Sequence, residues 1–242
     1  MALSQPVEDY LAAIYRAVHK GGQATTSEIA RRLNVSAAST THMFQRLAQE
    51  GLVRYKEYSG VSLTEAGEVA ALDVIRRHRL AERFLTDVLE IPWDRVDALA
   101  NRMEHALPAE VIQGFDRILD NPRTCPHGYP IPDAHGQVAL LSDRTLAEAA
   151  EGDELTVSRV DEDDPALLRY LAEAGLTPGQ RVRVMRKPPF EEPLVLDVGG
   201  QERTVGSRIA QSVYVCTPGD EGEEAGRAAA EGGGGGAAGP SD

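Results

Sequence analysis

Apolar residues recur at helical spacing along the first half of the chain. Residues 7–19 carry them at i, i+3, i+4, i+7 and i+11, which predicts an amphipathic helix. Residues 26–33 and 37–49 predict two more helices, separated by a short turn at residues 34–36. Two helices joined by so short a turn are typical of a helix-turn-helix, whose second helix enters the major groove of DNA.

Two short apolar runs follow the predicted recognition helix. Residues 52–58 and 61–63 have strand character and flank Ser59-Gly60, which predicts a small hairpin, or wing. We therefore predict a winged helix-turn-helix domain over residues 1–64 that binds double-stranded DNA.

A second helical region is predicted beyond the wing, over residues 65–136. Thr64 is a good N-cap for a helix that runs to about Leu89, and further helices are expected at residues 93–106 and 108–119. Their apolar side chains exceed what one stripe against the DNA-binding domain could cover. A homodimer interface is the natural use of this surface, because helix-turn-helix dimers bind two half-sites about one helical turn apart.

The rest of the chain predicts a small β-rich domain. Residues 121–132 are rich in Pro and Gly and predict an ordered loop, and residues 137–150 predict a linker. Residues 151–216 predict an SH3-like β-barrel, built from LTVSRV, RVRVM, LVLDVG and IAQSVYV as strands and from one helix in PALLRYLAEAGL. The Gly-rich acidic tail, residues 217–242, is expected to be disordered. The predicted fold class is thus mainly α with a small β part.

The distribution of charge bears on the DNA prediction. The net charge of −13 at first argues against nucleic acid, because DNA affinity rests largely on Lys and Arg. The first 80 residues, however, hold ten Lys or Arg against eight Asp or Glu, whereas the other residues hold fifteen against thirty. The acidic excess therefore lies outside the predicted DNA-binding domain.

Cysteine content and the N-terminal sequence predict a cytoplasmic protein. Cys125 and Cys216 are too few and too far apart for a disulfide framework, and the N-terminus lacks the basic flank and apolar run of a signal peptide. No apolar run reaches the roughly 18 residues that a membrane span needs, so no membrane role is expected.

Nitrogen and carboxylate side chains gather on the two helices after the wing. His78 and Glu82 are four residues apart and share a helix face, and a second group lines one side of the next helix. Each pair alone is more often a surface ion pair, and Asp9 in a first turn could simply serve the helix dipole. Their coincidence behind a DNA-binding domain predicts a metal-sensing regulator rather than an enzyme. The candidate ligands are Asp9, His78, Glu82, Asp97, Asn101, Glu104 and His105.

The exposed start of the recognition helix and the helix before it supply the candidate DNA contacts. Phe44 and Leu47 are expected to hold the recognition helix to its core instead. The candidate DNA-binding residues are Arg31, Arg32, Ser36, Ala38, Ser39, Thr40 and His42.

Four motifs occur in a specific combination: EDYL…IY near the start, RRHRLAERFL at 76–85, NRMEH at 101–105 and CPHGYPIP at 125–132. In this combination the chain resembles the diphtheria-toxin-repressor family of metal-dependent repressors, in the branch that includes the manganese regulators. The resemblance covers about residues 5–216, and DPALLRYLAEAGLTPG is similar to the FeoA-type module of the longer members. It implies a cytoplasmic homodimer that binds Fe²⁺ or Mn²⁺ and then represses metal-uptake genes.

The resemblance also implies a division of the ligands between two metal sites. The primary-site positions are Asp9, Asn101, Glu104 and His105. The second-site positions are His78, Glu82 and Asp97, and His78 serves either site. Ligands from the last domain are not assigned by the motifs; Glu191 and Glu192 are candidates, with surface loop as the favoured interpretation.

The departures from the iron-type pattern favour manganese. Iron-type members have a Met at the position of Asp9 and a Cys at that of Asn101, whereas this chain offers oxygen donors and no thiolate. Oxygen-rich sites suit Mn²⁺, so Mn²⁺ is the expected cofactor and Fe²⁺ the alternative. Asn101 is the weaker ligand and could offer only its backbone carbonyl. Metal would then join the first helix to the dimerisation helices and fix the separation of the two recognition helices.

Three other interpretations of the sequence are less favoured. Cys125 and His127 could belong to a zinc site. Because they are only two ligands in one loop and have no CxxC partner, a structural loop is favoured. A metallohydrolase would use the His and Glu cluster to activate water, yet the chain has no HExxH motif, nucleophile elbow or phosphate loop. The third interpretation is a winged-helix regulator that responds to no metal. Failure of the protein to bind any divalent ion would favour it over a metal-dependent repressor.

Overall fold

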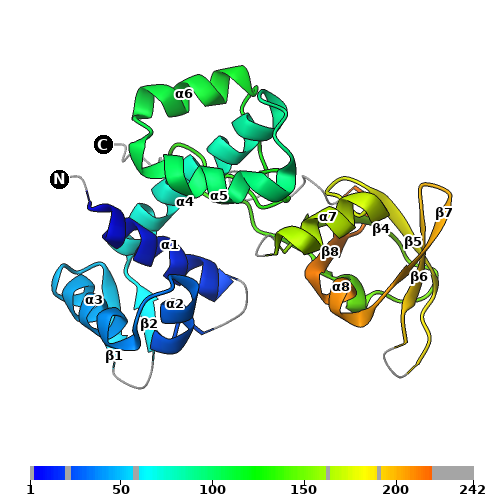
Figure 1. Ribbon diagram of the computed structural model, residues 1–242, viewed down its shortest axis with the longest axis horizontal. Helices are drawn as coiled ribbons and strands as arrows, with labels where there is room; N and C mark the ends of the chain where they lie inside the picture. Colours follow the sequence, from blue (N-terminus) through cyan, green and yellow to red (C-terminus); the bar gives the residue numbers. More distant parts are fainter. Residues whose placement is uncertain (1–2, 20–22, 57–59, 162–163, 190–191, 220–242) are drawn as a thin grey trace, which may run out of the picture. The chain divides into compact units, whose positions relative to one another are not determined.

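The chain folds into two compact units, which are described one at a time. The structure, a computed structural model, describes residues 3–19, 23–56, 60–161, 164–189 and 192–219 (Figure 1). Of these described residues, the first unit comprises those within 3–89, 98–123 and 131–137, and the second comprises those within 90–97, 124–130 and 138–219.

The first unit begins with the predicted winged helix-turn-helix, drawn in blue and cyan in Figure 1. The side chain of Thr25 caps the second helix, and the side chain of Ser36 caps the recognition helix, α3. The β1–β2 pair is the expected wing. The elements are α1 (Gln5–His19), α2 (Thr26–Arg32), α3 (Ala37–Gln49), β1 (Val53–Lys56) and β2 (Gly60–Leu63).

The helices that follow also form as the capping residues predict. Thr64 caps α4 (Glu65–Asp87), and its hydroxyl oxygen accepts a 3.1 Å hydrogen bond from the Gly67 backbone. The helix expected at residues 93–106 ends earlier, as α5 (Trp93–Met103), and continues as the 3₁₀ turn η1 (Glu104–Ala106). After Pro108 comes α6 (Ala109–Ile118). Helix α1 packs against α4, so the DNA-binding helices and α4 share one core.

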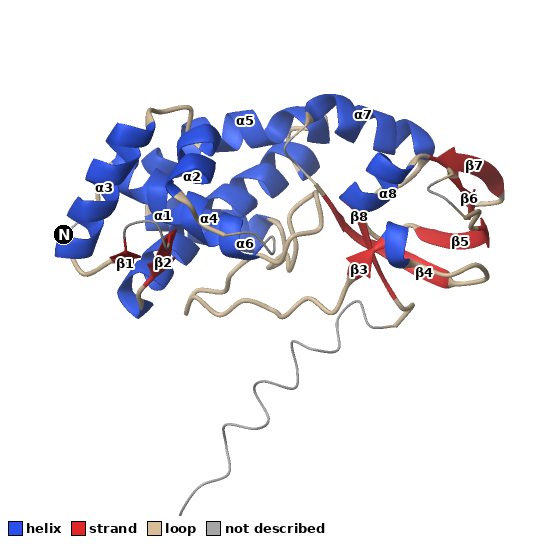
Figure 2. Cartoon of the chain, turned by 90° about the horizontal axis from the view of Figure 1, so that it is seen from below, coloured by secondary structure: helices blue, strands red, loops and turns tan. Residues whose placement is uncertain are grey.

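The second unit is built around an antiparallel sheet of six strands in the order β3-β8-β4-β5-β6-β7. Figure 2 shows these strands in red, with the helices α7 and α8 of the same unit in blue. Its core is aliphatic and includes four fully buried residues, Leu146, Val157, Leu171 and Leu196. The elements are β3 (Arg144–Thr145), η2 (Leu146–Glu148), β4 (Glu154–Val160), α7 (Pro165–Ala174), β5 (Arg181–Arg186), β6 (Leu194–Val198), β7 (Gln201–Val205), α8 (Ser207–Ser212) and β8 (Val213–Cys216).

Two expectations for this unit need correction. Residues 144–149 were expected in a linker, but Arg144–Thr145 pair with β8 and the fully buried Leu146 belongs to the core. The run IAQSVYV was expected to be one strand, but its first part lies in α8 and only Val213–Cys216 forms a strand. The β7 strand was not predicted at all.

Some sequence predictions fall outside the described residues. These are the tail from residue 220 onward, the candidate ligand Glu191, and residues 57–59 of the predicted hairpin. Within the described segments, no helix has the length and apolar character that crossing a membrane requires.

Candidate metal centre

Two elements of the first unit bring three predicted ligands together. Helix α1 buries the face that carries Tyr10 and Leu11, so that Asp9 projects from its flank with 36% of its side chain exposed. The 3₁₀ turn η1 places Glu104 and His105 in succession, with the Glu104 residue only 3% exposed.

The donor atoms of Asp9, Glu104 and His105 converge on one point. His105 Nε2 lies 2.9 Å from Asp9 Oδ1 and 3.3 Å from Glu104 Oε1. One ligand atom from each of the three side chains lies within 4.8 Å of the others. Residues 95 positions apart in the sequence thus form one group of two carboxylates and one imidazole.

A divalent cation fits this donor set. Burial raises the pKa of the Asp9 carboxyl above its usual range, and the negative charges of Glu104 and Glu8 add to that rise against the attraction of His105. The three side chains offer two carboxylate oxygens and one imidazole nitrogen. A divalent cation bound there would offset the negative charge of the carboxylates.

His78 connects Glu104 with Glu82. The His78 Nδ1 atom donates a 2.6 Å hydrogen bond to Glu104 Oε2, and Nε2 lies 3.6 Å from Glu82 Oε1. The side chains of His78 and Glu82 are 2% and 0% exposed, so both ionisable groups are held away from solvent. The Nε2 atom of His78 is consequently turned towards Glu82.

The predicted ligands Asn101 and Asp97 do not belong to the group formed by Asp9, Glu104 and His105. Asn101 lies on α5 one turn before Glu104 and is exposed. Asp97 belongs to the second unit, and its role as a ligand stays a prediction. In the same unit Cys125 and His127 are buried in one turn, where His127 stacks on Trp93 at a centroid distance of 5.5 Å.

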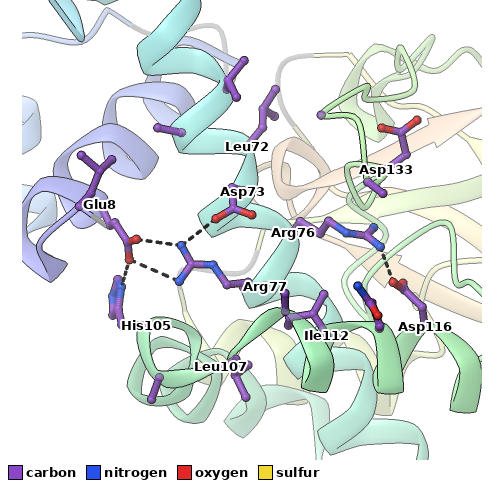
Figure 3. Close-up of a pocket in the computed structure, with 18 of the residues that line it drawn as sticks. Glu8, Leu72, Asp73, Arg76, Arg77, His105, Leu107, Ile112, Asp116 and Asp133 are labelled. Atoms are coloured by element: carbon purple, nitrogen blue, oxygen red, sulfur yellow. Dashed lines mark hydrogen bonds and ion pairs between the residues drawn. The ribbon is translucent and has the colours of Figure 1, made fainter. Parts of the chain in front are cut away.

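The sequence interpretation missed a third carboxylate at this centre. Glu8 Oε2 accepts a 2.6 Å hydrogen bond from His105 Nδ1, and Glu8 Oε1 accepts a 2.9 Å hydrogen bond from Arg77 (Figure 3). Burial alone would raise the pKa of the Glu8 carboxyl, but the hydrogen bonds from Arg77 and His105 outweigh it and hold that pKa below its usual value. Glu8 was not distinguished from an ordinary first-turn acid because only the tertiary fold brings it to His105.

Most of the predicted DNA contacts lie on an accessible face of α3. Ser36, Ala38, Ser39 and His42 are all exposed. Ser36 Oγ accepts a 3.1 Å hydrogen bond from the Ser39 backbone, which fixes the start of the helix. This is the end of a recognition helix that contacts base edges.

The expectation that Thr40 lies on the exposed face of the recognition helix is wrong, because Thr40 is fully buried. It shares a helix face with Phe44 and Leu47, at i, i+4 and i+7, and this face packs inward. Its hydroxyl donates a 3.1 Å hydrogen bond to Ser36 O and lies 3.3 Å from Tyr10 Oη. Thr40 thus joins the recognition helix to α1, next to Asp9.

Arg31 and Arg32 lie at the end of α2. The side chain of Arg31 is 72% exposed and pairs with Glu28 at 2.8 Å, while Arg32 is 20% exposed and lies 3.7 Å from the same carboxylate. Arg31 is accessible to a phosphate, whereas Arg32 is more enclosed.

Family models for three consecutive domains match the chain. Residues 2–61 match the N-terminal DNA-binding domain of iron-dependent repressors, residues 64–133 match their metal-binding and dimerisation domain, and residues 144–216 match the FeoA domain. Together these matches span most of the chain.

Individual proteins are similar over comparable lengths. The chain is 32% identical over 225 residues to the iron-dependent repressor IdeR of Mycobacterium leprae, covering 88% of this chain and 97% of that protein. A manganese-dependent transcriptional repressor solved in complex with manganese is 35% identical, with a TM-score of 0.82 over 87% of this chain and 99% of the other. The crystal structure of T. acidophilum IdeR is 29% identical, with a TM-score of 0.74 over 90% and 99% of the two chains.

Proposed function

Since the chain belongs to the diphtheria-toxin-repressor family of metal-dependent transcriptional repressors, we propose that it represses genes of metal-ion homeostasis in response to Mn²⁺. Proteins of this family are DNA-binding repressors rather than enzymes, and they bind their operators as dimers with divalent metal ions. The proposed cytoplasmic location follows from this role at the operator.

The observation that carries the proposal is the convergence of Asp9 with Glu104 and His105. Asp9 comes from α1, which contacts the recognition helix through Tyr10, and the other two come from the turn that follows α5. We propose that these three side chains hold the ion. When bound, the ion supplies positive charge between two carboxylates that otherwise repel each other. Holding α1 at η1 would restrict the positions that the DNA-binding helices can take relative to the dimerisation helices.

The choice of Mn²⁺ rests on ligand chemistry. Asp9 and Glu104 offer carboxylate oxygens and His105 an imidazole nitrogen, and no sulfur donor belongs to this group of three. Carboxylate-rich sites suit Mn²⁺, whereas soft ligands favour other metals. Fe²⁺ is the second candidate, because the 32% identical relative is an iron-dependent repressor.

His78, Glu82, Asp97 and Asn101 have supporting roles in this proposal. The buried His78 and Glu82 pair would contribute to a second site, for which Asp97 stays a candidate from the sequence alone. Asn101 would complete the first site with its amide or backbone oxygen, one helical turn from Glu104.

For DNA, we propose that Ser36, Ala38, Ser39 and His42 reach base edges in the major groove. Arg31, and to a lesser extent Arg32, would contact phosphates. Two copies of this surface in a homodimer would bind the two halves of an operator.

The metal assignment is tested by anaerobic DNA binding at buffered free Mn²⁺ and Fe²⁺. An operator is first selected from a random duplex pool with the metal-loaded protein, and its binding is then measured by fluorescence anisotropy. A given site usually binds Fe²⁺ more tightly than Mn²⁺. We expect Mn²⁺ to support operator binding at free concentrations no higher than Fe²⁺ needs. A clear preference for Fe²⁺ would assign the chain to the iron-responsive type.

The Tyr10→Phe variant tests whether α1 transmits the metal-bound state to the recognition helix. It removes the hydroxyl that lies 3.3 Å from Thr40 Oγ1 and keeps the ring, which packs edge-on against Phe44. A hydrogen bond contributes about 0.5–1.5 kcal/mol, so operator affinity at saturating Mn²⁺ should fall about 2–10-fold. Metal affinity, measured by calorimetry, should stay within about twofold.

Tyr15→Phe is the matched control for this change. Tyr15 is also buried on α1, but its ring stacks on His19 rather than on α3. Equal operator affinities for the two variants would contradict the role of the Tyr10–Thr40 contact.

A further inference from the structure

We propose that Glu8, held by Arg77, is a positioning residue that orients the His105 ring so that its Nε2 atom faces Asp9 and Glu104. The inference rests on the proposed metal site and adds a residue that is not itself a ligand. It concerns which of the two imidazole nitrogens is available to metal.

The two nitrogens of His105 have different partners on opposite edges of the ring. Nδ1 donates a 2.6 Å hydrogen bond to Glu8, whereas Nε2 lies 2.9 Å from Asp9 and 3.3 Å from Glu104. A neutral imidazole has one protonated nitrogen and one with a free lone pair. An ionised carboxylate only accepts hydrogen bonds, so Glu8 keeps the proton on Nδ1. The lone pair is thereby left on Nε2, the nitrogen that faces the other ligands.

Arg77 holds Glu8 in this position. Its Nη2 atom donates a 2.9 Å hydrogen bond to Glu8 Oε1, and its Nη1 atom donates a 2.9 Å hydrogen bond to the backbone oxygen of Glu104. The side chains of Arg77 and Glu8 are only 12% and 14% exposed. One guanidinium from α4 therefore binds the carboxylate on α1, as Figure 3 shows, and also the backbone of η1, which carries the ligands.

A second ion pair in the same cavity provides a comparison. The cavity, of about 1000 Å³, is also lined by Arg76 and Asp116, which pair at 2.5 Å. Their side chains are 15% and 18% exposed, close to the values for Arg77 and Glu8. Asp116 accepts its hydrogen bond from Arg76 rather than from an imidazole, and Arg76 also donates to the Pro132 backbone oxygen. Loss of Asp116 thus removes a comparable ion pair but leaves His105 oriented.

The first test is calorimetric Mn²⁺ binding to the full chain as Glu8→Ala, Glu8→Gln, Asp116→Ala and Asp9→Ala variants. Loss of a residue that orients a metal-ligating histidine typically costs about 10–100-fold in affinity, and we expect this for Glu8→Ala. Glu8→Gln keeps an oxygen that accepts from Nδ1, so its loss should be smaller. Asp116→Ala should stay within about twofold of wild type, and thermal unfolding of each metal-free variant reports whether it folds.

The outcomes separate this inference from the site itself. If Asp9→Ala loses Mn²⁺ binding while Glu8→Ala binds like wild type, the site stands and the role of Glu8 is wrong. If Asp9→Ala also binds like wild type, the proposed site is wrong. Equal losses for Glu8→Ala and Asp116→Ala would indicate a general effect of losing an ion pair and would overturn the positioning role.

A second measurement needs no substitution. In ¹⁵N-histidine NMR of the wild-type protein loaded with diamagnetic Zn²⁺, His105 should show a proton on Nδ1 and coordination through Nε2. Coordination through Nδ1 would overturn the inference, because Glu8 could not then accept a hydrogen bond from that atom. The Glu8→Ala spectrum should show that the Nδ1 proton exchanges faster with solvent.

Discussion

Replacing Asp9 with Ala should lower Mn²⁺ affinity by more than about 100-fold and abolish metal-dependent operator binding. Loss of a residue that only orients a metal ligand typically lowers metal affinity about 10–100-fold. Loss of a ligand itself should lower metal affinity further. Within the group of Asp9, Glu104 and His105, only Asp9 comes from α1, the helix that contacts α3. Calorimetry and anisotropy would measure the two effects separately.

Glu65→Ala is the matched control for the Asp9 change. Both residues are acids near the start of a helix, and Glu65 is an exposed residue in the first turn of α4. If Asp9 served only the helix dipole, the two variants would behave alike, with stability losses of about 0.3–1 kcal/mol and unchanged metal response. An Asp9→Ala protein with wild-type metal dependence would refute the role of α1 in the switch.

Replacing Gly67 with Ala should destabilise the first unit by about 3 kcal/mol, at the upper end of the usual cost of overpacking. A Cβ at Gly67 would lie 1.9 Å from the Leu52 backbone oxygen and 2.9 Å from the Leu52 carbonyl carbon. The same Leu52 oxygen accepts a 3.0 Å hydrogen bond from the Thr64 backbone, so relaxing the clash disturbs the junction between α3 and α4.

This prediction is opposite in sign to the intrinsic effect of the substitution, since Ala is about 1 kcal/mol more favourable than Gly inside a helix. Gly114→Ala in α6 is the control, because a Cβ there would meet nothing nearer than the Arg117 side chain at 4.0 Å. Urea unfolding should show Gly114→Ala neutral or stabilised and Gly67→Ala destabilised. A stabilised Gly67→Ala protein would mean that α4 does not approach Leu52 so closely.

The helical part of the fold was predictable because its elements carry local information. The bounds of the recognition helix, residues 37–49, are those of α3, and Thr64 caps α4 as its residue type predicts. In both places a capping side chain and a regular apolar stripe lead to the same conclusion.

The sequence prediction failed at β7, where the pattern of apolar residues is weak, and at Thr40, a polar residue on an apolar helix face. Strand β7 has few buried residues. The sequence signal for a hairpin there is the pair Gly199-Gly200, and in the structure both glycines have positive φ. The place of Thr40 near the start of α3 favours exposure, but its spacing from Phe44 and Leu47 puts it on the buried face.

The candidate site was predictable only in part. Glu104 and His105 could be selected from their types and spacing, and Asp9 was added from its place on the first helix. The partner of His105 Nδ1 could not be selected, because Glu8 lies 97 residues before His105 and meets it only in the folded unit. Local periodicity predicts the face of a helix, whereas a hydrogen bond between helices depends on how they pack.

The most direct test of the metal switch is anaerobic operator binding by the wild-type protein, metal-free and saturated with Mn²⁺, at one fixed salt concentration. Coupling between two sites typically changes affinity about 5–150-fold, and we expect Mn²⁺ to tighten operator binding within or above that range. Equal affinity with and without Mn²⁺ or Fe²⁺ would contradict the account, since the Asp9, Glu104 and His105 cluster would then have no part in DNA binding.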